Sequence, residues 1–348
     1  MINKELHIIS HKETIRNAMK TLNSLGENLT LFVIDENDQL VGVITDGNIR
    51  RGLIRGINID EEVEKIMNIK FRFLFENKFS LDDIINLKRE SVKIIPFIDE
   101  EFKIKRIENI NSLKSLLPVD AVLMAGGRGE RLMPLTANKP KPMLEVSGKP
   151  ILERNIELLA AYGIHNIHIS VYYLSHLITS YFGDGKNRGL KIGYIEENKP
   201  LGTLAAVRMN KEFIHDDIIV MNSDLLTNIN FEDFYKTFKE SNADMAIATT
   251  RYNVTVPYAV LETVDNFVQS FKEKPSYTYF SNAGIYLIKR SNINIIPLGS
   301  HYDATDMIAD LLKEGKKIIS YPILGYWLDI GKHEDYSKAQ EDFKHIVF

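Results

Sequence analysis

A glycine-rich turn followed by basic side chains is the part of this sequence best suited to chemistry. The segment AVLMAGGRGERLMPLTANKPKPM passes from an apolar run into Gly126, Gly127 and Gly129. Glycines let a backbone approach a ligand closely. Arg131 offers a planar cation for phosphate oxygens, and Lys141 offers a second charge between two prolines, where the backbone has little freedom to lose. The pattern predicts a loop that holds phosphate groups and disfavours an ordinary surface turn.

The turn departs from two common phosphate-binding patterns. The P-loop ends in Gly-Lys-Ser or Gly-Lys-Thr, and GGRGERLM has no such ending. The dinucleotide fingerprint needs a third glycine and an immediate helix, but Leu132 takes the third position. Pro134, Pro140 and Pro142 also prevent a long helix. We therefore expect backbone groups and cations to hold the phosphates, and not mainly a helix dipole.

From residue 119 onward, expected strands alternate with expected helices. Strands are predicted over 120–126, 166–173, 217–224 and 244–250, and helices over 151–163 and 231–242. Such alternation indicates an α/β fold, a Rossmann-like and mostly parallel sheet with helices on both faces. Ligands bind at the carboxyl ends of strands in these sheets, which is where the glycine turn and Asp224 fall.

The residues before 118 have shorter elements that repeat in order. Helices are predicted over 13–25 and 81–90, and strands over 29–35, 40–45 and 92–100. LFVIDENDQLVGVITDGNI aligns with IPFIDEEFKIKRIENI, which suggests two copies of one α+β unit that bury their sheets against each other. We therefore predict two domains, residues 1–117 and 118–348.

Composition excludes several classes of protein. The chain has 348 residues, a formal net charge of −4 and no cysteine. Without a basic stripe, we expect no nucleic-acid partner and no anionic membrane partner. The polar N-terminus is unlike a signal peptide, and disulfides and cysteine-bound zinc are excluded. A soluble cytoplasmic protein is expected.

At this point the sequence resembles a known family. GGRGERLMPLTANKPKPMLEVSGKP is similar to the signature of the sugar-1-phosphate nucleotidyltransferases, and the likeness covers about residues 119–348. Further segments follow in the family's order: PLGTLAAV, NSD, EKP, SNAGIYL and WLDIGKHEDY. Ser223 stands where most members have glycine, and Lys332 where many have Thr or Ser. These departures leave the chemistry intact and put substrate detail in doubt.

The resemblance implies a reaction of a sugar 1-phosphate with a nucleoside triphosphate that yields a nucleotide-sugar and pyrophosphate. The attacking phosphate is already anionic, so positioning and charge neutralisation suffice without a general base. The implied catalytic residues are Arg131, Lys141, Asp224 and Asp329. The two aspartates would bind Mg²⁺, a hard cation that prefers oxygen ligands. Each follows an apolar strand-like run, and we expect both strands to end on one side of the sheet.

The resemblance also assigns substrate-binding residues. Those implied for the nucleotide are Ala125, Gly126, Gly127, Gly129, Glu197, Leu201, Gly202 and Thr203. Those implied for the sugar phosphate are Ala259, Glu273, Lys274, Asn282 and Gly284. A carboxylate at Glu273 suits sugar hydroxyl or amino protons, and an ammonium at Lys274 suits the phosphate. Glu196 or Glu197 could accept the adjacent N1–H and N2 amino protons of guanine.

The first domain resembles a tandem CBS module, a regulatory unit named after cystathionine β-synthase. Thr45 and Asp46 take the places that contact the ribose of an adenine nucleotide, and the second copy lacks this pair. A module of this kind before such a transferase resembles glucosamine-1-phosphate guanylyltransferases of legionaminic-acid and related pathways. We therefore expect GTP and glucosamine 1-phosphate as substrates.

Several alternatives remain open. The same chemistry could use dTTP, UTP or CTP, or mannose or another hexose 1-phosphate. A protein of another class, a non-catalytic nucleotide sensor, would bind at both domains and react at neither. The CBS module could bind a nucleotide or serve only in assembly. A homo-oligomer is expected, because both kinds of domain commonly assemble.

Overall fold

The computed structural model describes residues 2–26, 29–76 and 78–346. They form two compact units. The first holds the chain up to Pro118 with the short segments Ala160–Ile164 and Gly185–Leu190, and the second holds the rest. Among the described residues, no helix is long and apolar enough to cross a membrane.

The first unit contains two three-stranded sheets with the same strand arrangement. Its elements are η1 (Lys4–His7), β1 (Ile8–Ser10), α1 (Ile15–Ser24), β2 (Thr30–Ile34), β3 (Leu40–Thr45), α2 (Asp46–Ile54), η2 (Val63–Lys65), β4 (Leu74–Phe75), α3 (Leu81–Arg89), β5 (Ile94–Ile98) and β6 (Ile104–Asn109). The strand orders are β1-β2-β3 and β4-β5-β6. In each sheet the first two strands are parallel, and the last two are antiparallel. This is the pattern that the sequence repeat predicts.

The two copies share a core. Phe32 and Leu40 of the first sheet pack in one buried apolar cluster with Ile94, Ile98 and Ile107 of the second. The helices begin at side chains that accept backbone hydrogen bonds, as N-cap residues do: Thr14 before α1 and Ser80 before α3. The predicted burial of one sheet against the other is therefore present.

The chain after Pro118 is built on a larger sheet, and all of its elements belong to the second unit except η5 and the last two residues of α4. Its elements are β7 (Val119–Met124), η3 (Glu130–Leu132), η4 (Lys141–Met143), β8 (Glu145–Val146), β9 (Lys149–Pro150), α4 (Ile151–Ala161), β10 (Asn166–Val171), α5 (Ser175–Phe182), η5 (Lys186–Arg188), β11 (Lys191–Glu196), α6 (Ala205–Met209), β12 (Asp217–Asn222), β13 (Leu225–Thr227), α7 (Phe231–Glu240), β14 (Met245–Thr255), β15 (Val260–Val264), β16 (Phe267–Lys272), β17 (Ser276–Lys289), η6 (Arg290–Ile295), α8 (Ala304–Lys313), β18 (Ile318–Pro322), β19 (Trp327–Asp329) and α9 (His333–Asp342).

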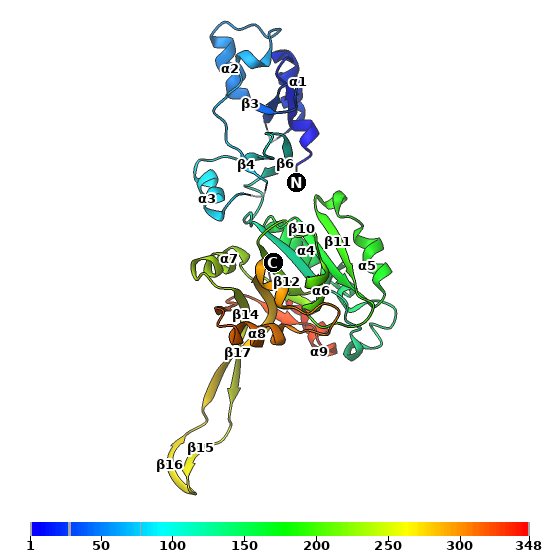
Figure 1. The fold of residues 1–348 in the computed structure, drawn as a ribbon, viewed down its shortest axis with the longest axis vertical. Coiled ribbons are helices and arrows are strands. Elements are labelled where there is room, and N and C mark those ends of the chain that lie inside the picture. The colour runs from blue at the N-terminus through cyan, green and yellow to red at the C-terminus, as the bar shows by residue number, and fades with distance from the viewer. Residues whose placement is uncertain (1, 27–28, 77, 347–348) are drawn as a thin grey trace. The chain divides into compact units, whose positions relative to one another are not determined.

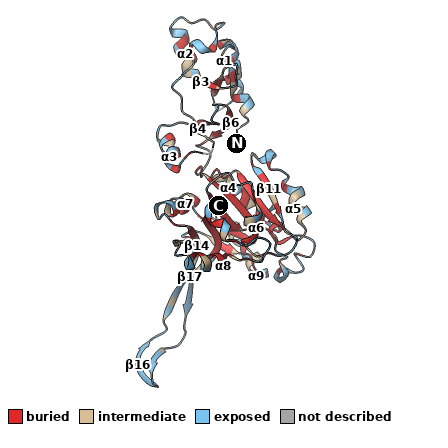
Figure 2. Ribbon diagram, viewed as in Figure 1, coloured by how far each residue is buried: buried red, intermediate tan, exposed pale blue. Residues whose placement is uncertain are grey.

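Seven strands form the central sheet in the order β11-β10-β7-β12-β17-β14-β18 (Figure 1). Four neighbouring pairs are parallel, and only β17 runs antiparallel to its neighbours. Consecutive residues of β7 are fully buried, so both faces of the sheet are covered (Figure 2). The predicted mostly parallel α/β fold is confirmed.

The central strands carry the site residues at their carboxyl ends. β7 ends at Met124 just before the glycine turn, β12 ends at Asn222 just before Asp224, and β11 ends at Glu196 just before Glu197. On one face the sheet packs on α6 and α8 through a shared apolar cluster. Three segments that are distant in sequence thus open onto one edge.

Candidate active site

The glycine turn packs tightly against the stem of Lys141. Gly129 has a φ of +64°, which favours glycine. A Cβ atom at this position would lie 2.9 Å from Lys141 Cβ and 3.0 Å from Thr136 Cγ2. The Thr136 hydroxyl donates a hydrogen bond of 2.9 Å to the Gly129 carbonyl. Between this turn and α4, the described residues form the short helical turns η3 and η4 and no longer helix, as the prolines predict.

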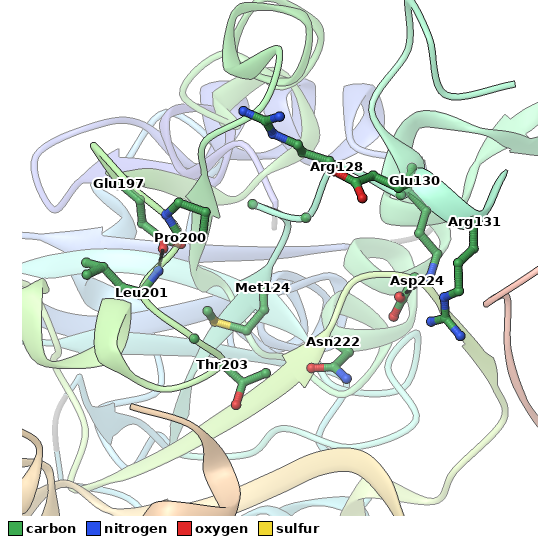
Figure 3. A pocket seen from close by; sticks show the side chains of 15 residues that line it. Met124, Arg128, Glu130, Arg131, Glu197, Pro200, Leu201, Thr203, Asn222 and Asp224 are labelled. Carbon is green, nitrogen blue, oxygen red and sulfur yellow. Dashed lines mark hydrogen bonds and ion pairs between the residues drawn. The ribbon is translucent and has the colours of Figure 1, made fainter. Parts of the chain in front are cut away.

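A cleft of about 590 Å³ lies between the turn and the carboxyl ends of the strands. It is lined by Met124, Gly126, Gly127, Arg128, Gly129, Glu130, Arg131, Lys141, Glu197, Pro200, Leu201, Gly202, Thr203, Asn222 and Asp224. Figure 3 shows Glu197, Pro200 and Leu201 at one end and Arg131 with Asp224 at the other. One end is therefore suited to a base and the other to phosphates.

Lys141 lies between the two aspartates. It is 8 % exposed, forms an ion pair with Asp224, and its Nζ lies 3.8 Å from Asp329 Oδ1. The aspartates meet because β13 and β19 pair antiparallel, with Leu225 opposite Asp329. The expectation that both aspartates follow strands of one sheet is wrong, since β19 belongs to this separate two-stranded ladder. The two carboxylates nevertheless flank one buried cation.

Each of the two carboxylates has one oxygen that accepts no hydrogen bond and could bind a divalent cation. Asp224 Oδ1 and Asp329 Oδ1 are buried and have no hydrogen-bond partner among the residues described. Burial, and then the negative charge of Asp224, raises the pKa of Asp329 above its ordinary value, while Lys141 and Arg131 act in the opposite direction. Two repelling carboxylates with free oxygens are the donor set that Mg²⁺ prefers.

Ser223 and Asn155 fix the backbone that carries Asp224. The Ser223 hydroxyl donates to the Met124 carbonyl at 2.6 Å, and the Asn155 amide donates to the Ser223 carbonyl at 3.1 Å. Both side chains are buried. The departure from glycine at Ser223 thus adds a tie between the carboxyl ends of β7 and β12.

Arg131 lies beside the second aspartate's turn. A Cβ atom at Gly331 would lie 3.5 Å from Arg131 Nη2, so the guanidinium occupies the space next to this glycine. The side chain of Arg131 is exposed to solvent. A phosphate group in the cleft therefore has access to it.

Glu197 is held in place at the other end of the cleft. Its carboxylate accepts hydrogen bonds from the Ser170 hydroxyl and, at 3.1 Å, from the Leu201 amide. A Cβ atom at Gly126 would lie 3.1 Å from Glu197 Oε1, so only glycine fits there without displacing the carboxylate. Glu196 is exposed and is not among the lining residues.

Asp303, which the sequence analysis missed, anchors the loop that contains Gly202 and Thr203. Its carboxylate accepts a 2.9 Å hydrogen bond from the Thr203 amide, and the Thr203 hydroxyl accepts one of 2.8 Å from the Ala304 amide. Gly202 has a φ of +90° and approaches the Tyr302 carbonyl closely. The signal was present as the D-x-x-D start of α8, a capping pattern.

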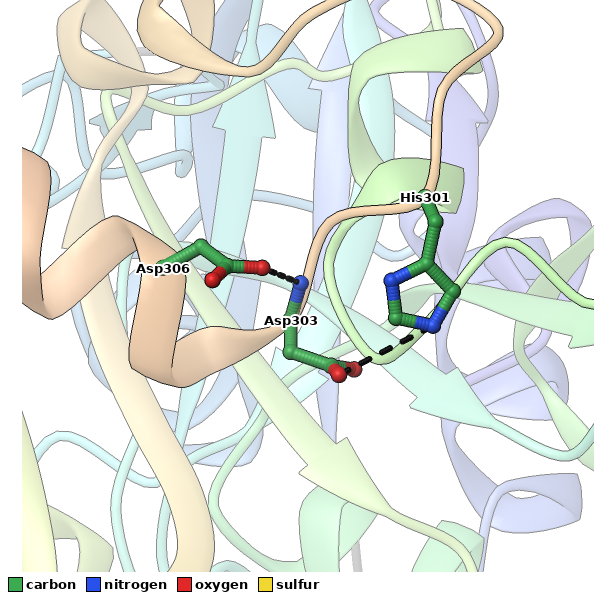
Figure 4. A group of neighbouring side chains, drawn as sticks. All are labelled: His301, Asp303 and Asp306. Atoms are coloured by element: carbon green, nitrogen blue, oxygen red, sulfur yellow. Dashed lines mark hydrogen bonds and ion pairs between the residues drawn. The ribbon is translucent and has the colours of Figure 1, made fainter.

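Asp303 also belongs to a small polar group with His301 and Asp306 (Figure 4). The Asp303 amide donates to Asp306 at 2.8 Å, and His301 Nε2 lies 3.8 Å from Asp303 Oδ2. These contacts serve the start of α8 and the loop at Thr203. The group therefore has a structural explanation.

The residues expected to bind the sugar phosphate are not all brought to the cleft. A Cβ atom at Gly284 would lie 2.6 Å from the side chain of the lining residue Asn222, and Asn282 accepts the Gly284 amide at 2.9 Å. Ala259, Glu273 and Lys274, in contrast, lie on a long ribbon that continues from β14 and β17. None of these three lines the cleft.

Three further residues lie at or beside the glycine turn and the end of β12. Ala125 is buried, and its amide donates to the Ser170 carbonyl at 2.9 Å. Arg128 and Asn222 line the cleft and were not predicted, although they lie within the recognised segments GGRG and NSD. Their sequence signal is adjacency, since Arg128 lies between Gly127 and Gly129 and Asn222 lies two residues before Asp224.

In the first unit, Thr45 and Asp46 begin α2. The Asn48 carboxamide oxygen accepts from the Thr45 amide at 3.0 Å and from its hydroxyl at 2.6 Å, and Asp46 is exposed in the first helical turn. The segment is therefore the start of a helix. Asp46 is available to a ligand at the start of the helix.

Two family models match parts of the chain. A family model described as nucleotidyl transferase matches residues 120–345, and a CBS domain model matches residues 1–55. The mannose-1-phosphate guanylyltransferase of Mycobacterium tuberculosis is 31 % identical over 232 residues, 64 % of each chain. The UTP–glucose-1-phosphate uridylyltransferase of a Synechocystis species is 32 % identical, over 63 % of this chain and 62 % of that protein.

Solved structures are also similar to part of this chain. HddC from Yersinia pseudotuberculosis is similar with a TM-score of 0.52 and 30 % identity, over 65 % of this chain and 99 % of that one. A second structure of HddC is a complex with GMP-PN. The chain spans less than two thirds of the length of the curated relatives it matches.

Proposed function

The chain belongs to the nucleotidyl transferase family, and we propose that it transfers a nucleotidyl group from a nucleoside triphosphate to a sugar 1-phosphate. The products are a nucleotide-sugar and pyrophosphate. The observation that carries the proposal is the placement of Lys141 between Asp224 and Asp329 at one end of the cleft. Cations and free carboxylate oxygens there suit a reaction between two phosphates.

The reaction forms one bond and breaks one. A phosphate oxygen of the sugar 1-phosphate attacks the α-phosphorus, and the bond between the α- and β-phosphates breaks to release pyrophosphate. The nucleophile is anionic, so this chain needs no side chain that removes a proton. Arg131 and Lys141 neutralise the charge on the phosphates, and the backbone of the glycine turn lets the nucleotide approach.

Asp224 and Asp329 are proposed to hold Mg²⁺ through their free oxygens. When bound, the ion supplies positive charge that offsets the phosphate oxygens. The contribution of the chain is to keep both carboxylates in place through the β13–β19 ladder. The hydrogen bonds of Ser223 and Asn155 add to this positioning.

GTP is the proposed nucleotide. A guanylyltransferase among the relatives and the complex of HddC with GMP-PN support this choice, and the uridylyltransferase relative keeps UTP as the alternative. Glu197 is the proposed reader of the base, since it lines the cleft and Glu196 does not. Its remaining lone pairs would accept the N1–H and N2 amino protons of guanine.

Glucosamine 1-phosphate is the proposed sugar, and formation of a precursor for legionaminic acid or a related surface glycan is the proposed role. The CBS domain match ahead of the transferase match supports this arrangement. Mannose 1-phosphate is the alternative, because the relative from Mycobacterium tuberculosis is a mannose-1-phosphate guanylyltransferase. Asn282 and Gly284 are proposed to contact the sugar beside Asn222.

The test is a panel of four nucleoside triphosphates against several sugar 1-phosphates with Mg²⁺, with pyrophosphate as the readout. Release of pyrophosphate with GTP and glucosamine 1-phosphate, in preference to the other pairs, is expected. Release with a different pair would replace the proposed substrates. Absence of pyrophosphate with every pair would overturn the enzymatic function in favour of a nucleotide sensor.

A further inference from the structure

Residues 250–281, named here the arm, continue the central sheet as a two-stranded ribbon. The pairing of β14 with β18 ends at Thr249, and the pairing of β17 with β12 ends at Ile285. Between β14 and β17 the ladder continues to Thr255 opposite Ser276, and β15 and β16 follow it (Figure 1). The arm is thus an extension of two core strands.

The ribbon next to the sheet has one apolar face, and its other face carries the polar residues Arg251, Asn253 and Thr278 together with Phe280. Tyr252 lies opposite Tyr279, and Val254 lies opposite Tyr277, so these four side chains share a face. On the other face the Thr278 hydroxyl donates to Asn253 at 2.8 Å. Alternation of this kind is typical of a ribbon that is covered on one side.

The apolar residues of the arm are exposed in the single chain. Its six aromatic residues that are more than half exposed are Tyr252 (61 %), Tyr258 (75 %), Phe267 (73 %), Phe271 (66 %), Tyr279 (57 %) and Phe280 (56 %). Phe280 lies opposite Arg251, on the same face of the ribbon as Asn253 and Thr278. At about 150–250 Å² for each aromatic side chain, the other five present on the order of 650 Å². One partner in a specific protein interface buries about 800 Å², so these five side chains could supply most of such a surface.

A covering partner also explains why the ribbon keeps its form. An isolated two-stranded ribbon is marginally stable in water at best. The direction of the ribbon is set by the parts of β14 and β17 that are buried in the central sheet. These parts begin at Met245 in β14 and at Ala283 in β17. A ribbon that is held at one end and apolar on one face is suited to packing against another protein surface.

We propose that the arm packs against the arm of a second copy of this chain and places Glu273 and Lys274 at the open side of that copy's cleft. The inference rests on the proposed function, because that function assigns Glu273 and Lys274 to binding of the sugar phosphate. It makes the dimer a requirement of the active site. Each cleft is completed by the neighbouring chain.

The length of the ribbon fits this arrangement. From Asn282 to Lys274 the strand covers eight steps, roughly 26 Å at about 3.3 Å per residue. This separates Lys274 from its own cleft, which the ribbon adjoins at Gly284 and Asn222. A two-fold axis near Tyr252 and Tyr279 places the two apolar faces together and brings Lys274 of each chain to the base of the other ribbon.

Charge is compatible with a second copy as the occupant. The arm carries Arg251, Lys272 and Lys274 against Glu262, Asp265 and Glu273, so it is neutral and two arms do not repel each other. The cleft also needs a further positive charge, which the Lys274 ammonium can supply. Lys141 is already paired with Asp224, and a sugar phosphate brings a second anion beside the nucleotide. Lys274 supplies the charge for it.

The first test measures the oligomeric state by analytical ultracentrifugation. The double variant Tyr252→Ser/Tyr279→Ser removes the apolar face, and Asn253→Ser/Thr278→Ala on the polar face is the matched control. A dimer is expected for the wild type and the control, and a folded monomer for the apolar-face variant. A monomeric wild type at micromolar concentration overturns the proposal.

The second test joins Lys141→Ala and Lys274→Ala chains, carrying two different affinity tags, into one purified heterodimer. Each homodimer is expected to be nearly inactive. The heterodimer has one intact cleft that meets one intact arm, so about half of the wild-type rate is expected for a two-fold dimer. An inactive heterodimer beside an active wild type overturns the transfer of Lys274 between chains. If the wild type releases no pyrophosphate at all, the proposed function fails, and the ultracentrifugation still decides the pairing of the arms.

Discussion

Asp224 and Asp329, which are far apart in the sequence, are held together by a short antiparallel ladder. Leu225 lies opposite Asp329, and the Ile330 amide donates to the Asp224 carbonyl at 3.2 Å. Their spacing therefore depends on backbone pairing and does not rely on the side chains alone. The pair stays in place when one charge is removed, which makes its function testable.

Asp224→Asn and Asp329→Asn are each expected to lower kcat by on the order of 10²–10³, because each removes a preorganised charge with little change in shape. The measurement is pyrophosphate release together with thermal unfolding. Asp216→Asn is the matched control, since this exposed aspartate precedes β12, the strand that ends just before Asp224. Near-normal turnover in either variant would remove that residue from the proposed metal site.

Glu197→Gln is expected to weaken the preference for GTP over the other triphosphates, by about 1–3 kcal/mol in relative kcat/KM, because a hydrogen-bond acceptor for guanine is lost. Glu196→Gln is the control, because this neighbour is exposed and lies outside the cleft lining. The measurement is competition between triphosphates. An unchanged preference in both variants would show that the base is read elsewhere.

Asp46→Asn is expected to abolish the effect of an adenine or guanine nucleotide on the transferase rate. Effectors commonly change affinity by about 5–150-fold, so an effect of this size should be lost. Asp82→Asn is the control, because Asp82 is also an exposed aspartate in the first turn of a helix. Binding of AMP, ATP and GTP to the full-length protein by calorimetry is the second readout. If no nucleotide binds at millimolar concentration, the module has an assembly role.

His168 is expected to make the protein less stable in mild acid. It is 2 % exposed, and burial lowers the pKa of its ring below the ordinary value, an effect that nearby Asp120 opposes. The unfolded chain then binds a proton more readily, so stability falls as the pH drops below about 6.5. His168→Gln should flatten the dependence of unfolding free energy on pH below about 6.5.

The measurement is urea unfolding at several pH values. His176→Gln is the control, because this histidine is exposed on α5. It should leave the dependence as in the wild type. An equal slope in the His168 variant and the wild type would assign the acid sensitivity to other groups.

Local pattern was enough to predict the class of fold and the place of the glycine turn at the carboxyl end of β7. Apolar runs at strand and helix spacing are set by which face is buried, so the sheet and the repeat in the first unit could be read from sequence. Glycine widens the backbone conformations that are allowed at positions 126, 127 and 129, and proline narrows them on both sides of Lys141. These effects act within a few residues and do not depend on the rest of the chain.

Tertiary structure alone decided which distant residues meet. Nothing in the runs before Asp224 and Asp329 shows that β13 pairs with β19, because strand pairing depends on the packing of the whole unit. For the same reason Asp303 was missed as the anchor of Thr203. Lys274 was expected at the cleft, and the sequence could not show that β14 and β17 continue as a ribbon that carries it away. A period-2 pattern fixes which side of a strand is apolar, and the surface that covers that side belongs to the tertiary or quaternary structure.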